Sequence, residues 1–259
     1  MKTTKASIYD FPTYYDLVFG SDTAAELKFL NECFATYVTG KTKRLFEPAC
    51  GTGRLLYRLG KQGYEVGGID LNSKAVSFCN RRLEKYGLKG RAMVGDMSDF
   101  VAGRRYCAAF NTINSFRHLP TEEAAMGHLQ CVANLLRPGG IYVLGLHLTP
   151  TRGEASDEES WSARRGNLAI NTHMWPIEKN PRRRQERFGI QFCVYRPTGT
   201  LKINDVLELR SYTAKQFSSL LAAVPQLKPV EFFDFHYDLK NPIKVDATTE
   251  DIVVVLRRS

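Results

Sequence analysis

Several features of common protein classes are missing from this sequence of 259 residues. No apolar run approaches the roughly 20 residues that a membrane-spanning helix requires. Residues 1–7 (MKTTKAS) contain no apolar segment of the kind found in secretory signals. The six cysteines are scattered and form no Cys-x-x-Cys pair, so neither a disulfide framework nor a metal site is expected. These absences predict a cytoplasmic globular protein with no membrane partner and no bound metal.

Residues 47–53 (EPACGTG) form a glycine turn that lacks the features of two familiar nucleotide-binding loops. A P-loop would continue with Gly-Lys-Ser/Thr, which does not follow. The dinucleotide fingerprint G-x-G-x-x-G requires three glycines, but Ala49 and Arg54 occupy its outer positions in one register. In the other register, Leu56 stands in the last position. A dehydrogenase is therefore the least favoured interpretation.

Two acids around this turn indicate a different ligand. Glu47 directly follows an expected strand over residues 44–46, where its charge would repel a diphosphate and attract an ammonium or sulfonium group. Asp70 ends the next expected strand, about 20 residues beyond the glycines, where a carboxylate that binds both ribose hydroxyls belongs. S-adenosylmethionine (SAM) carries both cations and a ribose, so it fits the two acids together.

Five motifs in order extend this pattern: residues 47–53, 69–71 (IDL), 95–97 (GDM), 111–116 (NTINSF) and 135–140 (LLRPGG). In order and spacing the chain resembles the class I SAM-dependent methyltransferases, from about residue 14 to its C-terminus. Ala49 replaces the usual glycine, a change that is tolerated if φ stays negative there. The resemblance implies SAM as cofactor, S-adenosylhomocysteine (SAH) as product, and these cofactor-binding residues: Tyr15, Glu47, Ala49, Cys50, Gly51, Gly53, Arg54, Asp70, Leu71, Asn72, Gly95, Asp96, Met97, Asn111 and Asn114. Cys50 is open to two interpretations, a reactive thiol or a small loop filler, of which the second is favoured.

Strands and helices alternate through the first 150 residues, which predicts an α/β fold with a doubly wound parallel sheet. The resemblance implies seven strands, mostly parallel, as in a Rossmann-like methyltransferase. Asn72 is expected to start a helix, residues 138–140 to stop another, and Thr213 with Gln216 to form a capping box. The expected strands cover residues 44–46, 64–70, 91–94, 106–113 and 141–146, then 230–237 and 251–256.

The pattern changes after residue 147, where three strands at 168–175, 188–195 and 200–209 predict an antiparallel β insertion. It leaves the edge of the sheet where ligands bind, so we expect it to roof the pocket for the acceptor. The predicted parts are an N-terminal helical lid (1–42), a SAM-binding core (43–147), the roof (148–210), and the end of the core with a closing hairpin (211–259).

The net charge of +9 is densest in residues 179–187 (KNPRRRQER). We favour a solvated hairpin tip, partly balanced by Glu178 and Glu186, over a nucleic-acid-binding surface. No recognition helix, RNP-type aromatic pattern or zinc finger accompanies the charge. An RNA or protein methyltransferase that uses this basic hairpin stays an alternative, as does a SAM-binding regulator without activity.

The resemblance implies a small-molecule acceptor, as in amine and amino-sugar methyltransferases, with N-methylation favoured over O-methylation. His118 lies just beyond the fourth strand, in a setting similar to that of a histidine in those enzymes. It is therefore a candidate general base; the alternative is that it only makes a structural hydrogen bond. His147, after the fifth strand, is a second and less favoured candidate. Tyr14 and Tyr15 resemble the tyrosine-bearing lid of the family, or are simply packing aromatics. The sequence leaves the oligomeric state open.

Overall fold

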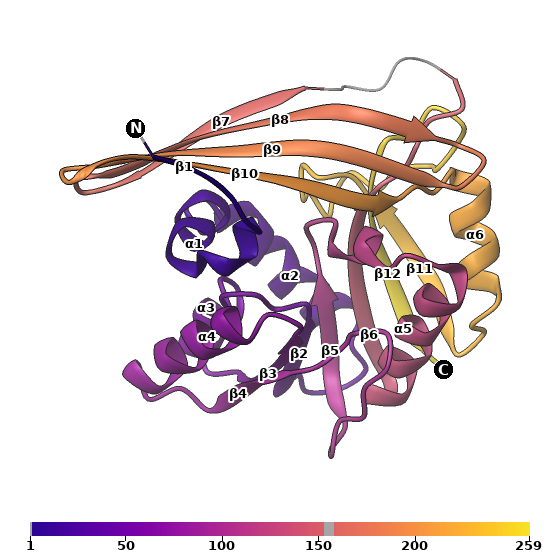
Figure 1. The fold of residues 1–259 in the computed structure, drawn as a ribbon. Helices are drawn as coiled ribbons and strands as arrows, with labels where there is room; N and C mark the ends of the chain where they lie inside the picture. Colours follow the sequence, from indigo (N-terminus) through magenta and orange to yellow (C-terminus); the bar gives the residue numbers. More distant parts are fainter. Residues whose placement is uncertain (1, 153–157) are drawn as a thin grey trace.

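The computed structural model describes residues 2–152 and 158–259, so residue 1 of the predicted lid and residues 153–157 of the predicted insertion lie outside it. Two sheets form the molecule: a seven-stranded sheet with helices on both faces, and a five-stranded sheet that extends above one end of it (Figure 1). No helix in the described ranges is both long enough and apolar enough to cross a membrane.

The seven-stranded sheet confirms the predicted fold class. Its order is β11-β12-β6-β5-β2-β3-β4, with β12 alone antiparallel to its neighbours. The central strand β5 is buried along its whole length, as expected for a parallel strand covered by helices on both sides. The strand bounds are β2 (Arg44–Pro48), β3 (Glu65–Asp70), β4 (Gly90–Val94), β5 (Tyr106–Asn111), β6 (Leu136–His147), β11 (Leu227–Phe233) and β12 (Asp251–Arg258).

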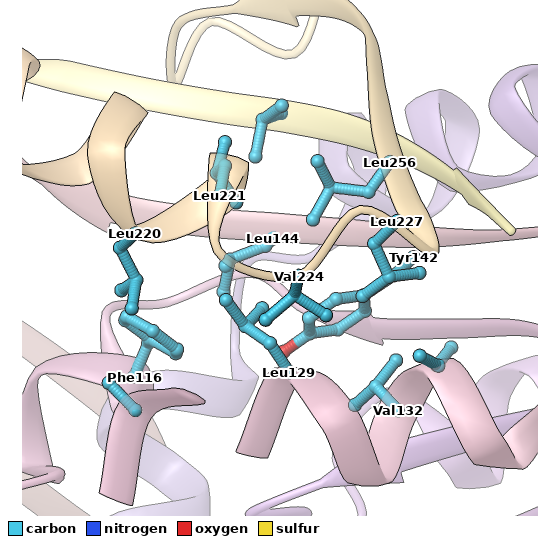
Figure 2. Packing of buried hydrophobic residues seen from close by; sticks show 14 of the residues in the cluster. Phe116, Leu129, Val132, Tyr142, Leu144, Leu220, Leu221, Val224, Leu227 and Leu256 are labelled. Atoms are coloured by element: carbon cyan, nitrogen blue, oxygen red, sulfur yellow. The ribbon is translucent and has the colours of Figure 1, made fainter. Parts of the chain in front are cut away.

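Helices cover the two faces of this sheet and bury a hydrophobic core on each. One core joins α5 and α6 to β6 and β12, and Figure 2 shows Leu129 and Val132 of α5 against Tyr142 and Leu144 of β6. The other core joins α2, α3 and α4 to the opposite face. The helix bounds are α2 (Ala24–Tyr37), α3 (Leu56–Lys61), α4 (Ser73–Lys85), α5 (Glu122–Leu135) and α6 (Ala214–Ala222).

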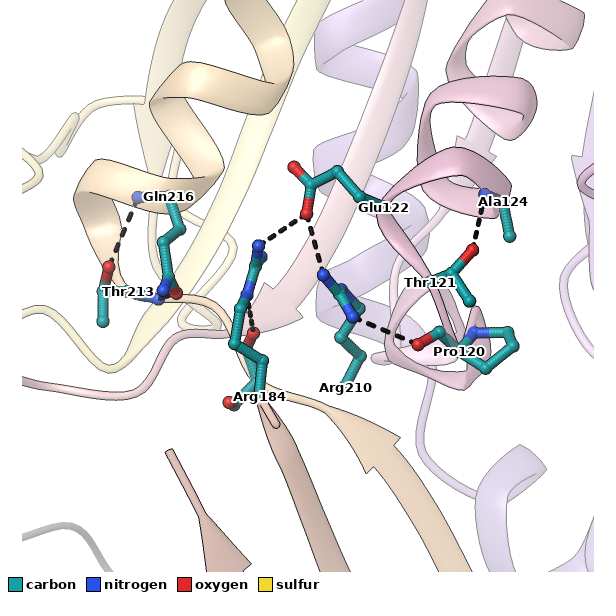
Figure 3. A network of polar contacts seen from close by, with 9 residues as sticks. Pro120, Thr121, Glu122, Ala124, Arg184, Arg210, Thr213 and Gln216 are labelled. Atoms are coloured by element: carbon teal, nitrogen blue, oxygen red, sulfur yellow. Dashed lines mark hydrogen bonds and ion pairs between the residues drawn. The ribbon is translucent and has the colours of Figure 1, made fainter. Parts of the chain in front are cut away.

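The predicted helix starts are confirmed. The side chain of Asn72 accepts hydrogen bonds from the second and third amides of α4. Thr213 and Gln216 form the expected capping box at α6, and Thr121 caps α5 (Figure 3). These caps satisfy amides that would otherwise lack partners at the helix ends.

Helix α5 ends at Leu135, before residues 138–140 as expected, and β6 begins directly after it at Leu136. The register of β6 against β5 shifts between Tyr106 and Ala108, which leaves residues 137–140 as an irregular segment within the strand. Gly139 has a φ of +73°, which explains why glycine stands there. A Cβ on Gly140 would meet the Cys107 carbonyl oxygen at 2.8 Å.

The roof contains more strands than the three expected. Its order is β1-β10-β9-β8-β7, and β1 from the N-terminus pairs in parallel with β10. Edge strand β7 escaped the sequence analysis because it is largely polar, with only Ala163 buried. The bounds are β1 (Lys2–Lys5), β7 (Glu159–Arg165), β8 (Leu168–Asn180), β9 (Gln185–Arg196) and β10 (Gly199–Arg210).

The N-terminal segment joins the two sheets. After β1 it forms the 3-10 helix η1 (Ile8–Asp10) and helix α1 (Pro12–Gly20), which lies beneath the roof (Figure 1). Its apolar side chains pack with Phe192 and other roof residues in a third core. The predicted lid is therefore partly strand, and it is anchored to the roof as well as to the seven-stranded sheet.

Candidate active site

The predicted ligand loop lies at the carboxyl edge of the parallel strands, between β2 and α3. Gly51 and Gly53 both have positive φ, as their residue type allows. A Cβ on Gly53 would meet Cys79 Sγ at 2.3 Å, so glycine is also required for space. Ala49 has a φ of +52°, so the condition under which alanine would replace glycine here without strain is not met. A non-glycine residue in the left-handed region costs about 1–2 kcal/mol, so this loop stores strain.

Glu47 is the least satisfied group of the loop. Its side chain is 5% exposed, and within the described ranges its Oε2 atom has no hydrogen-bond partner. Burial raises the pKa of Glu47 well above its ordinary value, and the nearby Arg54 charge offsets only part of that effect. A buried carboxylate oxygen without a partner is costly, and Oε2 can still accept from a ligand.

Asn111, at the end of neighbouring strand β5, presents a second unsatisfied acceptor. Its Nδ2 donates to the Pro48 carbonyl at 2.7 Å, while its buried Oδ1 has no partner among the described residues. Because β2 and β5 are adjacent and parallel, Glu47 and Asn111 stand at the same edge of the sheet. Two acceptors thus lack donors beside one glycine loop.

Asp70, at the end of β3, is held in a fixed orientation. Its Oδ2 accepts from the Gly51 amide at 2.7 Å, and its Oδ1 accepts from the Asn72 amide at 2.8 Å. Burial raises the pKa of Asp70, and these two amides oppose the shift. Each oxygen keeps a lone pair, so the carboxylate can still accept from a ligand.

Beyond Asp70, two apolar side chains stand unusually exposed. Leu71 is 69% exposed and Val94, at the end of β4, is 58% exposed. Exposed apolar surface at a ligand edge favours contact with a flat apolar ring. Asp96 follows on the next loop and is exposed, and its Oδ1 accepts from the amide and the hydroxyl of Ser98.

Three other predicted cofactor residues have structural roles in the folded chain. Asn72 caps α4 and donates through Nδ2 to Asp10 at 2.9 Å. Met97 packs in the core, and its carbonyl lies 3.0 Å from His128 Nδ1. At Gly95, a Cβ would collide with a core side chain.

The structure places Arg54 and Cys50 in structural positions. Arg54 donates to both oxygens of Glu26, at 2.5 and 2.7 Å, within a buried network that includes Thr112. Sequence reasoning missed Glu26, because nothing in α2 marks one buried acid. Cys50 is buried, and its contact with Cys79 and its burial raise the pKa of its thiol. A thiol of this kind is unreactive, which favours the loop-filler interpretation.

Tyr14 and Tyr15 have separate surroundings. The ring of Tyr15 lies beside Gly51 and lines the cavity described next. Tyr14 stacks on Phe11, and its hydroxyl accepts from Arg196 of the roof at 3.2 Å. Tyr15 is therefore the lid tyrosine nearer to the ligand loop.

A cavity of about 700 Å³ lies between the carboxyl edge of the seven-stranded sheet, the N-terminal lid and the roof. The five-stranded sheet lines one side of this cavity, and Tyr15 and Arg54 line it next to the ligand loop. The apolar lining from the five-stranded sheet is Trp161, Met174, Phe188, Ile190, Leu207 and Leu209. The same sheet adds three charged residues, Glu159, Lys179 and Glu186. The opposite wall contributes polar groups, among them His118, His147 and Asn114.

His118 and His147 differ in how they are held. The Nε2 atom of His118 lies 3.0 Å from the Tyr9 hydroxyl, and its enclosure and the Arg117 charge lower the pKa of His118. The Nδ1 atom of His147 lies 2.5 Å from Oδ1 of Asp251, its partner on β12.

Buried and half-buried ion pairs join the roof to the seven-stranded sheet. The buried Glu186 of β9 pairs with the buried Arg117. Arg184, from the basic tip, and Arg210 both donate to Glu122 at the start of α5, at 2.5 and 2.9 Å (Figure 3). The prediction of a solvated tip balanced by Glu186 is therefore wrong for Arg184 and Glu186, whose ion pairs connect the five-stranded sheet to the seven-stranded sheet and its helices.

Among the described residues, no group of His, Cys, Asp and Glu side chains is arranged to hold a metal ion.

Comparison with known proteins agrees with this geometry. Residues 46–140 match a family model described as a methyltransferase domain. A curated relative from Streptomyces venezuelae, a dTDP-3-amino-3,4,6-trideoxy-alpha-D-glucopyranose N,N-dimethyltransferase, is 30% identical over 138 residues. That match covers 52% of this chain and 56% of the relative, so the chain spans about half the length of the relative.

Solved structures share the fold over almost the whole chain. A SAM-dependent methyltransferase from Clostridium acetobutylicum superposes with a TM-score of 0.77 at 18% identity, covering 96% of this chain and 98% of the other. A SAM-bound amino pentose methyltransferase from Micromonospora echinaspora superposes with a TM-score of 0.73 at 18% identity, covering 98% and 99%. At these identities, the likeness establishes the fold.

Proposed function

We propose, from the premise that residues 46–140 form a methyltransferase domain within a Rossmann-like methyltransferase fold, that the protein is a SAM-dependent methyltransferase. Its acceptor is a small molecule that carries an amine. The observation that carries the proposal is the buried Oε2 atom of Glu47, which has no partner among the described residues, in a glycine loop whose Arg54 lines the cavity. The relatives named as amino-sugar N,N-dimethyltransferases support nitrogen over oxygen as the methylated atom.

The residues present fit SAM. Glu47 and Asn111 offer unsatisfied acceptors for its ammonium group. Asp70 can accept from the ribose hydroxyls, and the exposed side chain of Leu71 can cover the adenine ring. When bound, SAM supplies an activated methyl group, so the protein mainly has to align the acceptor and exclude water.

The cavity lining supports a cationic acceptor with an apolar body. Two of its cations already neutralise acids, since Arg54 pairs with Glu26 and Arg117 pairs with Glu186. The lining also holds the carboxylates of Asp22, Glu159, Glu250 and Asp251 and one further cation, Lys179, so its acids outnumber its cations. Such a lining favours an ammonium group over a phosphate.

We assign one role to each of the four chain segments predicted from the sequence. Residues 1–42 close the site as a lid, residues 43–147 bind SAM, residues 148–210 roof the acceptor, and residues 211–259 complete the sheet. A cytoplasmic location is part of the proposal.

Calorimetry with SAH, followed by turnover on an acceptor panel, tests the proposal. The panel contains tryptamine, benzylamine and dTDP-3-amino-3,6-dideoxyglucose, with tyrosol as an oxygen acceptor. We expect SAH to bind and an amine to be methylated faster than tyrosol. No SAH binding at millimolar concentration would refute the proposal, and SAH binding without turnover on a broad panel would favour a non-catalytic regulator.

The RNA or protein methyltransferase alternative depends on the basic tip. Arg184 is engaged with Glu122, which leaves Arg182 and Arg183 as the exposed arginines of residues 181–184. Salt-dependent RNA binding that is lost on neutralising Arg182 and Arg183 would revive that alternative.

A further inference from the structure

Two histidines line the cavity, and their hydrogen bonds leave different atoms available. His118 uses Nε2 toward Tyr9, whichever of the two groups donates. His147 instead uses Nδ1 toward Asp251, at 2.5 Å. Because a carboxylate accepts only, a neutral His147 carries its proton on Nδ1 and keeps the lone pair of Nε2.

Three contacts hold His147 at this position. Its backbone amide donates to the Asn114 side chain at 3.0 Å. Its ring packs edge-on against Phe235, with ring centroids 5.0 Å apart. Asp251 is its cross-strand partner, so the pair joins the last residue of β6 to the first residue of β12. The histidine side chain is 36% exposed, and it lines the cavity.

We propose that His147, oriented by Asp251, accepts the proton that the acceptor amine must lose before methyl transfer. This inference rests on the proposed function. It assigns the base role to the second histidine and gives His118 the role of a hydrogen-bond partner for the lid residue Tyr9. The contact between a base and an orienting carboxylate is a recurrent arrangement in enzymes that move protons.

The step balances as follows. The acceptor enters as an ammonium ion and gives one proton to Nε2 of His147, which forms an imidazolium beside the Asp251 carboxylate. The freed nitrogen lone pair forms the bond to the methyl carbon, and the electron pair of the broken carbon–sulfur bond stays on sulfur. The product leaves as a methylated ammonium ion, and His147 returns its proton to water.

The two buried acids of the cavity lining, Glu186 and Glu26, do not offer the same arrangement. Glu186 is buried against Arg117 and accepts from Thr149 at 3.0 Å. Glu26 is bound to Arg54 through both oxygens. His147 thus combines an oriented ring with a nitrogen left for the acceptor.

The test begins with imidazole tautomers, measured by NMR on histidine-labelled protein saturated with SAH. His147→Gln assigns the resonance. We expect the neutral ring of His147 to carry its proton on Nδ1 in the wild type. In Asp251→Asn, whose amide can also donate, we expect Nε2–H to gain population. A wild-type ring protonated on Nε2 would overturn the proposal, because that tautomer has no lone pair there.

Kinetics with the best amine of the panel named above form the second measurement. We expect His147→Gln to lower kcat by about 10²–10⁴-fold with little change in KM, as removal of a general base does. In His147→Ala, added imidazole should restore part of the rate. His173→Gln is the matched control, because His173 makes a 2.5 Å contact with Glu158 away from the cavity lining. It should leave kcat unchanged.

The outcomes distinguish a wrong choice of base from a wrong proposed function. A loss of kcat in His118→Gln but not in His147→Gln would overturn this assignment and leave the proposed methyltransferase function standing. Failure of the wild type to bind SAH would instead count against the proposed function itself.

Discussion

Replacing Glu47 by Gln should weaken cofactor binding and stabilise the free protein at the same time. The carboxylate is buried, and its Oε2 atom has no partner in the described part of the chain, so the free protein bears the cost of its desolvation. A neutral amide removes that charge and should stabilise the free protein by on the order of 1 kcal/mol. A hydrogen bond to a charged group contributes about 1.5–3 kcal/mol, so SAH affinity should fall roughly 10- to 150-fold.

Glu26→Gln is the matched control for Glu47→Gln. Both glutamates are 5% exposed, but Glu26 is bound to Arg54 through both oxygens. Removing one partner of a buried pair costs about 3–5 kcal/mol, because the other charge stays buried. The same substitution should therefore have opposite effects on stability at the two sites.

The pH dependence of stability follows from the direction of the pKa shift. Burial raises the pKa of Glu47 above its ordinary value of 4.5, so the native state holds this proton more tightly than the unfolded state. The contribution of this proton to the free energy of unfolding is fully present below the pKa of the unfolded state. It is lost as pH rises through the pKa of the folded state. In Glu47→Gln this loss should be absent.

Urea unfolding between pH 4 and 8 and SAH calorimetry measure these effects. If Glu47→Gln binds SAH as tightly as the wild type, the assignment of Glu47 to the cofactor cation is refuted. If both Gln variants are destabilised equally, the argument from the unpartnered oxygen is refuted.

Three further predictions concern the framework around the site. Gly53→Ala should cost about 1–3 kcal/mol more than Gly63→Ala in urea unfolding, since both glycines have positive φ but only the Gly53 Cβ would meet a neighbour; equal losses would contradict the steric argument. Burial lowers the pKa of His128 to about 4, so the unfolded state takes up this proton first on acidification. Stability should then fall by about 3 kcal/mol between about pH 6.5 and 4, and His128→Asn should lack this component in a pH series of chemical denaturation. Arg117→Met should cost about 3–5 kcal/mol of stability in thermal denaturation, because it leaves the buried Glu186 carboxylate without its partner. Adding Glu186→Leu should recover much of that loss, because it removes the lone charge. A double variant as unstable as the single one would show that burial of the charge is not the cause.

The fold was largely predictable because each core element carries a local pattern. Asn72 and the capping box at Thr213 mark helix starts through short-range hydrogen bonds that the sequence spells out. Strand β5 is fully buried and therefore reads as a continuous apolar run. Strands β1 and β7 were missed because both are edge strands, which need few apolar side chains. In addition, β1 pairs with β10, about 200 residues further along the chain.

The sequence placed Glu47 and Asp70 near each other because each stands at the carboxyl end of a strand, and β2 and β3 are adjacent and parallel. His147 and Asp251 are 104 residues apart, and their contact depends on the pairing of β6 with β12. The positive φ of Ala49 was equally hidden, because alanine normally avoids that conformation.

Transfer of a ¹³C-labelled methyl group from SAM tests the central claim most directly. The protein is incubated with labelled SAM and a mixture of the amine panel, tyrosol and total RNA, and the labelled products are identified by NMR and mass spectrometry. We predict that the label appears on the nitrogen of a small amine. Label found on RNA or on tyrosol alone, or retained entirely on SAM, would contradict the claim.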